Sequence, residues 1–347
     1  DLNLAGGKGR HNVLNSATDN TIWVKGSSIS SPHQTSIGII ATKASGNTII
    51  LDSTTINPAK NAAAETSGVI GILAPETADN NTISITGATD SSGANVNSIF
   101  SFMGMAGIAG SEVSGNNYTN PSGGTLTASN NRIAVQHMDL VGQLNGITGI
   151  AAKNASGNTI IFSDGTITGN ILTADNFNIL GDGSDYHVPQ KVVGLSADGS
   201  VTGNTVSFTN VTRLSAGVEG LNGVAGSTVE NNTISFSGKG KDASVLDSAG
   251  CIFGIRGVDA PTNYWPMQNY LPAARAAGNT IAVRNLTLIS NEGGEGLLGI
   301  KVSDTAAGNS IFLQNCDINS AQGLAGIGVG VGFLPVTVRT TDGSQIT

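Results

Sequence analysis

The stretch Ala155–Ile161, ASGNTII, decides the fold, because the same seven letters stand at Ala44–Ile50. Looser copies follow one another along the chain, and all of them align on one asparagine. Successive aligned asparagines are 27, 34, 50, 27, 46, 28, 47 and 30 residues apart. A basic unit of 27 to 30 residues, with insertions in three places, predicts stacked repeats. The aligned asparagines are Asn20, Asn47, Asn81, Asn131, Asn158, Asn204, Asn232, Asn279 and Asn309.

The columns beside the asparagine have a physical explanation. The preceding residue is always Asp, Asn or Gly, as at Asp19, Asn80 and Gly157, and these types best tolerate a left-handed backbone. We therefore expect a sharp turn there. Large apolar residues follow two and four positions after the asparagine, as at Ile160 and Phe162, and a period of two predicts a strand with one buried face.

The aligned asparagine itself has two interpretations. A polar amide at the same place in every unit can hydrogen-bond to its copies above and below as a ladder. Alternatively, each asparagine is an isolated turn residue. A turn alone would accept Asp or Ser as readily, so the recurrence of asparagine in all the copies favours the ladder.

Two further segments recur in each unit. A glycine-rich apolar segment precedes the turn, as in SIGIIATKA at 36–44 and GITGIAAKN at 146–154, and a short segment such as GTIT at 165–168 follows the GNTI strand. Each unit therefore offers three short strands joined by turns. Small residues in the glycine-rich segment allow close approach of neighbouring backbones.

A unit of this kind is what a parallel β-helix requires, and the repeats resemble the passenger domains of bacterial autotransporters and related large surface adhesins. The resemblance covers about residues 12–347 and implies an all-β fold, a right-handed parallel β-helix of about nine or ten coils in one domain, residues 1–347. It further implies a secreted or outer-membrane-tethered cell-surface protein that binds a surface protein or glycan of a host or neighbouring cell without catalysis. Such repeats are specific for architecture and not for activity.

Composition agrees with a folded chain that is rich in turns. Of its residues 39% are hydrophobic, which excludes disorder, while only 12% are charged and 48 residues are glycine. The net charge of −8 with scattered Lys and Arg argues against a nucleic-acid partner. The sequence contains no run of about 18 apolar residues, so no membrane-spanning helix is predicted. Cys251 and Cys316 lack metal-site spacing and are expected to be free, buried thiols.

Three segments interrupt the repeat at about 86–130, 170–192 and 258–276, and we interpret them as insertions that leave the rod. The third contains Tyr264, Trp265 and Tyr270, which either bind a ligand or form a local core over the rod. The second has clustered oxygen side chains at 176–187 but no recognised calcium motif, so a solvated turn is expected. Met103 and Met105 in the first are expected to fill the core.

The outward residue between the two buried ones provides a further candidate surface. Trp23, Ile50, Ile161 and Phe312 occupy that position and predict an apolar stripe that supports binding or self-association. A column of threonines directly after the aligned asparagines raises a self-assembling or ice-binding solenoid as an alternative, although regular TxT pairs are missing.

The alternative of another class is a β-helical polysaccharide lyase or hydrolase. Such enzymes need stacked carboxylates with a basic group, or Asp residues flanking the scissile bond. Neither pattern is visible, His11, His33, His137 and His187 are scattered, and no cofactor or metal site is predicted. The final residues, TDGSQIT at 341–347, resemble the opening of another coil with Ile346 inward, so we expect the chain to be a segment of a longer protein.

Overall fold

The computed structural model describes most of the chain as stacked strands, and within the described residues there is no helix. The described ranges are 14–29, 36–56, 68–101, 104–110, 125–142, 147–169, 191–216, 220–248, 252–256, 273–290, 297–320, 324–329, 332–333, 338–339 and 345–346.

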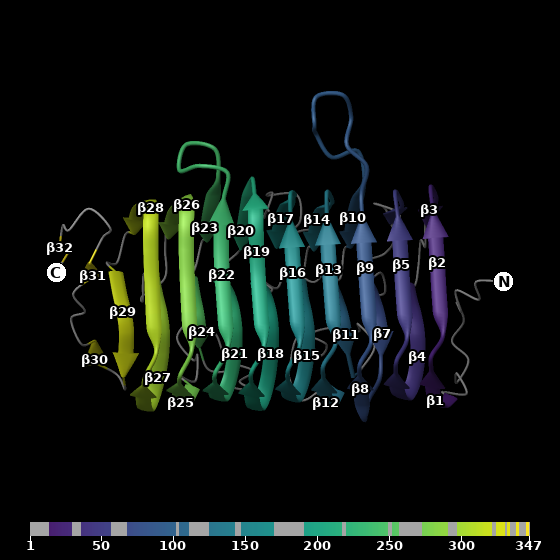
Figure 1. Ribbon diagram of the computed structural model, residues 1–347, viewed down its shortest axis with the longest axis horizontal. Coiled ribbons are helices and arrows are strands. Elements are labelled where there is room, and N and C mark those ends of the chain that lie inside the picture. Colours follow the sequence, from purple (N-terminus) through teal and green to yellow (C-terminus); the bar gives the residue numbers. More distant parts are fainter. Residues whose placement is uncertain are drawn as a thin grey trace, which may run out of the picture.

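The strands form a right-handed parallel β-helix whose coils follow one another along a single axis (Figure 1). Each coil contains one aligned asparagine, so the coils are numbered from coil 1 with Asn20 to coil 9 with Asn309. Within a coil, a glycine-rich strand leads to the asparagine turn, a GNT strand follows, and a second turn leads to a short strand. The glycine-rich strands form sheet A, and the other two kinds form sheet B.

The GNT strands pair in parallel from one end of the rod to the other. Their register aligns the same repeat position in every coil, as in Ile133, Ile160 and Val206. They are β2 (Thr21–Lys25), β5 (Thr48–Asp52), β9 (Thr82–Thr86), β13 (Arg132–Gln136), β16 (Thr159–Ser163), β19 (Thr205–Val211), β22 (Thr233–Gly238) and the first parts of β26 (Thr280–Ser290) and β28 (Ser310–Ser320).

The short strands complete sheet B behind the second turn. In coils 8 and 9 they are continuous with the GNT strand, because β26 and β28 run through the turn without a break. The separate short strands are β3 (Ser28–Ile29), β6 (Thr55–Ile56), β10 (Ser98–Ser101), β14 (Asp139–Gly142), β17 (Thr166–Gly169), β20 (Arg213–Ala216) and β23 (Val245–Ser248).

Sheet A closes the coil on the opposite side. Its strands are either long and continuous or split in two where extra residues intervene, as in coils 3, 4 and 8. They are β1 (Leu14–Thr18), β4 (Ser36–Ser45), β7 (Gly68–Leu73), β8 (Thr77–Asp79), β11 (Gly104–Ala109), β12 (Thr125–Ser129), β15 (Ile147–Ser156), β18 (Lys191–Thr202), β21 (Gly220–Glu230), β24 (Ile252–Arg256), β25 (Ala273–Ala277), β27 (Leu297–Ala307), β29 (Leu324–Val329) and β30 (Gly332–Phe333).

The backbone at the asparagine turn is left-handed in every coil, as the sequence predicts. The residue before the aligned asparagine has φ between 55° and 66° at all positions from Asp19 to Gly308. The second turn also contains a left-handed residue in every coil except 3 and 7, where a longer loop replaces it, and the sequence did not predict this feature. Its residue types vary, and examples are Ser53, His137, Asp164 and Asn285.

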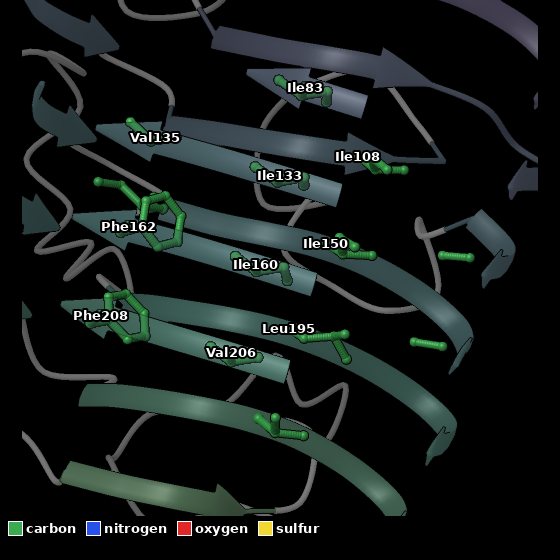
Figure 2. Packing of buried hydrophobic residues seen from close by; sticks show 14 of the residues in the cluster. Ile83, Ile108, Ile133, Val135, Ile150, Ile160, Phe162, Leu195, Val206 and Phe208 are labelled. Carbon is green, nitrogen blue, oxygen red and sulfur yellow. The ribbon is translucent and has the colours of Figure 1, made fainter. Parts of the chain in front are cut away.

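The core is a stack of apolar rows between the two sheets (Figure 2). One row continues Ile83, Ile133, Ile160 and Val206 of sheet B, and it faces Ile108, Ile150 and Leu195 of sheet A. In the next row of sheet B, Phe162, Phe208 and Phe236 stack with ring centroids 5.2 and 5.1 Å apart. Met105 is buried in this core, as expected, whereas Met103 lies outside the described residues.

Much of the segment that we interpreted as the first insertion belongs to the rod. Strands β10, β11 and β12 all lie within 86–130 and pair in parallel with neighbouring coils. The 50-residue spacing therefore contains the ordinary strands of one coil, separated by additional residues at 87–97 and 111–124. Similarly, β18 begins at Lys191, and β25 pairs with β27 from Ala273 and with β21 from Arg275. The last residues of the segments that we interpreted as insertions at 170–192 and 258–276 therefore belong to the rod.

The prediction for the end of the chain is wrong in its register. Strand β32 (Gln345–Ile346) pairs in antiparallel orientation with β31 (Val338–Arg339), and the two form a small sheet separate from sheets A and B. Ile346 therefore does not occupy the inward row of a further parallel coil. The TDGSQIT pattern matches the repeat locally, but the strand finds a different partner.

Candidate functional site

The aligned asparagines form one continuous ladder inside the rod. The Nδ2 of each asparagine donates to the Oδ1 of the next at 2.9–3.0 Å, from Asn20 to Asn309. The same Oδ1 accepts the backbone N–H of the preceding asparagine at 2.9–3.1 Å. From Asn47 to Asn279 the residues are at most 1% exposed. The ladder thus satisfies buried amides that would otherwise destabilise the coil.

A second row, which the sequence analysis missed, completes this network. The Nδ2 of Asn158 also donates to the carbonyl of Ala128 at 2.9 Å, and the Nδ2 of Asn81 donates to that of Ala44 at 3.0 Å. The accepting residue stands three positions before the asparagine of the preceding coil and is Ala or Val throughout. The sequence repeat already shows Ala or Val three positions before each aligned asparagine. The role of this residue required knowledge of which coil stacks on which.

The outward side chains of the GNT strands form the GNT face, a regular surface that runs from coil 1 to coil 9. Its first row is hydroxylic apart from Arg132 and lies directly beside the Asn ladder: Thr21, Thr48, Thr82, Arg132, Thr159, Thr205, Thr233, Thr280 and Ser310. Its second row lies two residues further along each strand: Trp23, Ile50, Ser84, Ala134, Ile161, Ser207, Ser235, Ala282 and Phe312.

The predicted apolar stripe is interrupted in this second row. Trp23 and Ile50 are neighbours, but Ser84 and Ala134 separate them from Ile161, and Phe312 lies in coil 9. Trp23 and Phe312 are 66% and 52% exposed. The four residues share one row, as predicted, yet they do not form a continuous apolar surface, because small and hydroxylic residues occupy the coils between them.

Polar links order the GNT face. Ser235 Oγ donates to Ser207 Oγ at 2.8 Å, and Ser207 Oγ lies 2.9 Å from Thr209 Oγ1. Lys25 Nζ lies 3.1 Å from the Asp52 carboxylate. The hydrogen bond from Ser53, together with Lys25, lowers the pKa of Asp52, so this carboxylate is ionised at neutral pH.

Two described loops rise from the same edge of the rod, where the GNT strand turns into the short strand (Figure 1). The first follows β9 and is held by Asn95, whose Nδ2 donates to Asp139 Oδ1 at 2.9 Å and to the carbonyl of Asp164 at 3.1 Å. Within it, hydrogen bonds from Ser92 and from the backbone N–H of Ala94 lower the pKa of Asp90. The second loop follows β22.

The aromatic candidates Tyr264, Trp265 and Tyr270 lie outside the described residues, as does the oxygen-rich segment 176–187. The interpretation of these segments as binding loops or as local structure therefore stays a prediction. Trp23 is the fourth aromatic binding candidate, and its described position is on the GNT face.

The described part of the chain contains no candidate metal site. No cluster of three or more His, Cys, Asp or Glu side chains with metal-binding geometry occurs in these residues. His137 is a half-buried residue of the second turn in coil 4, while His11, His33 and His187 lie outside the described ranges. On the short strands, Arg213 Nη2 lies 2.6 Å from Asp247 Oδ2, and Ser215 Oγ donates to the same carboxylate.

Cys316 is a free, half-buried thiol, and Cys251 lies outside the described residues. Burial raises the pKa of the Cys316 thiol, and its Sγ lies 3.3 Å from the carbonyl oxygen of Gln314. A raised pKa lowers the thiolate fraction at neutral pH, so this thiol is a poor nucleophile.

In the part of the chain that the structure describes, no helix has the length and apolar character needed to traverse a bilayer. Comparison of the sequence with family models and with curated proteins, and of the fold with solved structures, finds no match.

Proposed function

We propose that this chain is the binding rod of a secreted or bacterial cell-surface adhesin, similar to an autotransporter passenger domain, and that it acts without catalysis. The observation that carries the proposal is the GNT face, in which the same outward position repeats from coil 1 to coil 9 in strict register. A rigid, periodic surface is suited to an extended ligand that offers the same group many times.

The chemistry of the GNT face favours a glycan of a host or neighbouring cell as that ligand. Its first row offers hydroxyl groups at intervals of roughly 4.8 Å, the separation of neighbouring strands. Hydroxyl groups both donate and accept hydrogen bonds, which matches sugar hydroxyls. Within the first and second rows, Arg132 is the charged residue. The exposed ring of Trp23, at the end of the second row, can stack on a sugar.

The rigidity of the scaffold supports the same proposal. The Asn ladder runs directly beside the first row, so each outward threonine follows an asparagine that is hydrogen-bonded to the coils above and below. A preorganised surface loses little conformational freedom on binding, which raises affinity for a given set of contacts.

The proposal is tested with the purified chain in a solid-phase assay against a glycan array and a panel of cell-surface proteins. Ala134→Arg places a long cation at the centre of the GNT face, while Asn154→Arg places the same side chain on the exposed outer surface of β15 in sheet A. We expect saturable glycan binding that Ala134→Arg weakens at least about tenfold, the ratio that corresponds to about 1.4 kcal/mol. Asn154→Arg should leave it unchanged.

Binding that survives Ala134→Arg would place the adhesive surface elsewhere, and selective capture of a protein would replace the glycan. The enzyme alternative, a polysaccharide lyase or hydrolase, predicts turnover in the same panel. Release of unsaturated or reducing ends by the wild-type chain would overturn the non-catalytic assignment.

The threonine row also favours a second candidate, an ice-binding or self-assembling solenoid. Outward threonines occupy most of the first row, but the second row adds a hydroxyl only in some coils, such as Ser84, Ser207 and Ser235. Measurement of thermal hysteresis separates ice binding from adhesion, and sedimentation over a range of concentrations detects self-association. A positive result in either would favour this candidate.

A further inference from the structure

A narrow cavity lies inside the rod, between the two sheets, and extends from coil 1 to coil 5. Its volume is about 120 Å³. Ile22, Val24 and Ile29 line it in coil 1, and Thr148 and Phe162 line it in coil 5. The three coil 1 residues are half-buried, so the cavity reaches the end of the described stack.

The cavity exists because the size of one inward row changes along the rod. In sheet B this row contains Val24, Leu51, Ile85 and Val135 in coils 1 to 4, and then Phe162, Phe208 and Phe236. The phenylalanine rings stack and fill the space between the sheets in coils 5 to 7. The smaller aliphatic residues before them leave space along the axis. Figure 2 shows Val135 and Phe162 side by side at this change.

A single hydroxyl group points to what this cavity accommodates. Thr148 lines it, is 2% exposed, and its Oγ1 has no hydrogen-bond partner among the described residues. Its strand partners are Ala106 and Val193, and neither alanine nor valine is a residue type with a hydrogen-bonding side chain. An unpaired buried hydroxyl is costly, and a bound acceptor removes that cost.

We propose that the cavity is a binding site for an unbranched aliphatic chain with one oxygen function, which lies along the axis with its oxygen against Thr148. This site lies inside the rod and is independent of the adhesive surface proposed above. The volume is close to that of an apolar protein cavity of about 150 Å³ that takes up benzene. The cavity of this rod extends over four coil intervals, or about 19 Å at the usual strand separation. This elongated shape fits an aliphatic chain better than a ring.

Water is a poor competitor for this site. A buried water needs two to four polar partners, whereas Thr148 is the polar side chain among the residues that line the cavity. The remaining lining side chains are apolar, and burial of methylene groups against them is favourable. A chain alcohol satisfies both features, because its hydroxyl pairs with Thr148 while its methylene groups contact the isoleucine rows.

Calorimetric titration of the full chain with 1-octanol, n-octane and cyclooctanol tests the proposal. We expect saturable binding of 1-octanol, weaker binding of n-octane and no saturable binding of cyclooctanol. Val135→Phe extends the phenylalanine stack into the cavity and should weaken 1-octanol binding at least about tenfold, or about 1.4 kcal/mol. Val283→Phe extends the same stack at its other end, beyond Phe236, and should leave the affinity within about twofold.

Thr148→Val keeps the shape of the side chain and removes the hydroxyl. It should lower the affinity for 1-octanol by about two- to tenfold, the effect of one neutral hydrogen bond, and leave that for n-octane unchanged. If Val135→Phe does not fold, Ala106→Leu fills the cavity from sheet A instead. Absence of saturable 1-octanol binding to the folded wild-type chain, or equal binding to a folded cavity-filling variant, would overturn the proposal.

Discussion

Asn158 illustrates how one side chain connects three coils. Its Oδ1 accepts from Asn131, and its Nδ2 donates both to Asn204 Oδ1 and to the Ala128 carbonyl. All of these groups are buried, so the amide is fully satisfied in the absence of water. Aspartate would place a second acceptor where Nδ2 donates, and serine is too short to reach both neighbours. The geometry therefore explains why the repeat uses asparagine alone at this position.

We predict that Asn158→Ala lowers the free energy of unfolding by about 1–3 kcal/mol, because it leaves the Asn131 donors buried without an acceptor. Chemical denaturation monitored by circular dichroism measures the change. The matched control is Asn319→Ala, which truncates an exposed asparagine of β28 and should stay within about 0.5 kcal/mol. Equal losses in the two variants would contradict a structural role for the ladder.

The residue before the asparagine is constrained by its backbone. Gly157 has φ +62°, and a Cβ there would come 2.5 Å from Asn130 Oδ1. We predict that Gly157→Val destabilises the chain by more than about 1 kcal/mol through left-handed strain. Ile161→Ser, on the GNT face of the same coil, should cost little. Similar shifts in melting temperature for the two variants would show that the register assigned to this coil is incorrect.

The glycine-rich strands determine how closely sheet A approaches sheet B. Gly149, Gly194 and Gly223 occupy one row in successive coils. A Cβ at Gly194 would lie 2.3 Å from Val206 Cγ1 and 2.7 Å from the carbonyl oxygen of Gly223. Glycine is therefore required by packing against the opposite sheet and against the next coil, and not by an unusual φ.

Gly194→Ala should consequently destabilise the rod by about 1–3 kcal/mol, the usual cost of overpacking a filled core. Gly240→Ala is the corresponding control, because a Cβ at Gly240 meets no atom within 4 Å. Thermal unfolding followed by calorimetry compares the two. A neutral Gly194→Ala variant would mean that the two sheets can separate without loss of stability.

The strands of the rod form a linear stack in which each coil pairs only with neighbouring coils, although the loops after β9 and β22 reach one coil further through Asn95–Asp164 and Lys241–Asp317. The parallel pairings run from β2 to β28 in sheet B, so an interior coil is stabilised on both sides and a terminal coil of the described stack on one. Stability in such an array is approximately a sum of coil and interface contributions. Local opening should therefore begin at the ends.

Amide hydrogen exchange tests this expectation. We predict slow exchange in β16 and β19 and faster exchange in β2 and β28. Phe208→Ala, which removes the central ring of the stack, should cost about 3–5 kcal/mol and accelerate exchange first in coils 5 to 7. Coil 1 should retain its rates. Uniform acceleration in every coil would indicate that the rod unfolds as one cooperative unit.

The local pattern around each asparagine was sufficient to predict the parallel β-helix, the left-handed turns and the inward rows. These features depend on contacts within a few residues of the chain, such as the backbone preference at Gly157 and the alternation of Ile160 and Phe162. Because every coil repeats these local features, a chance match in one coil does not affect the prediction. Strand β32 is an exception, because its sequence matches the repeat although the strand pairs with β31 and not with a coil.

The sequence by itself determined the coil, its turns and its buried rows, because these follow from short-range sterics and the period of two in a strand. Only the tertiary structure decided the interruptions of the apolar stripe, the Ala carbonyls that complete the Asn ladder, the strands inside 86–130 and the cavity that ends at Phe162. The physical reason is that all four depend on which residues are stacked in adjacent coils. Spacings of 27 to 50 residues leave that alignment undefined until the strands pair.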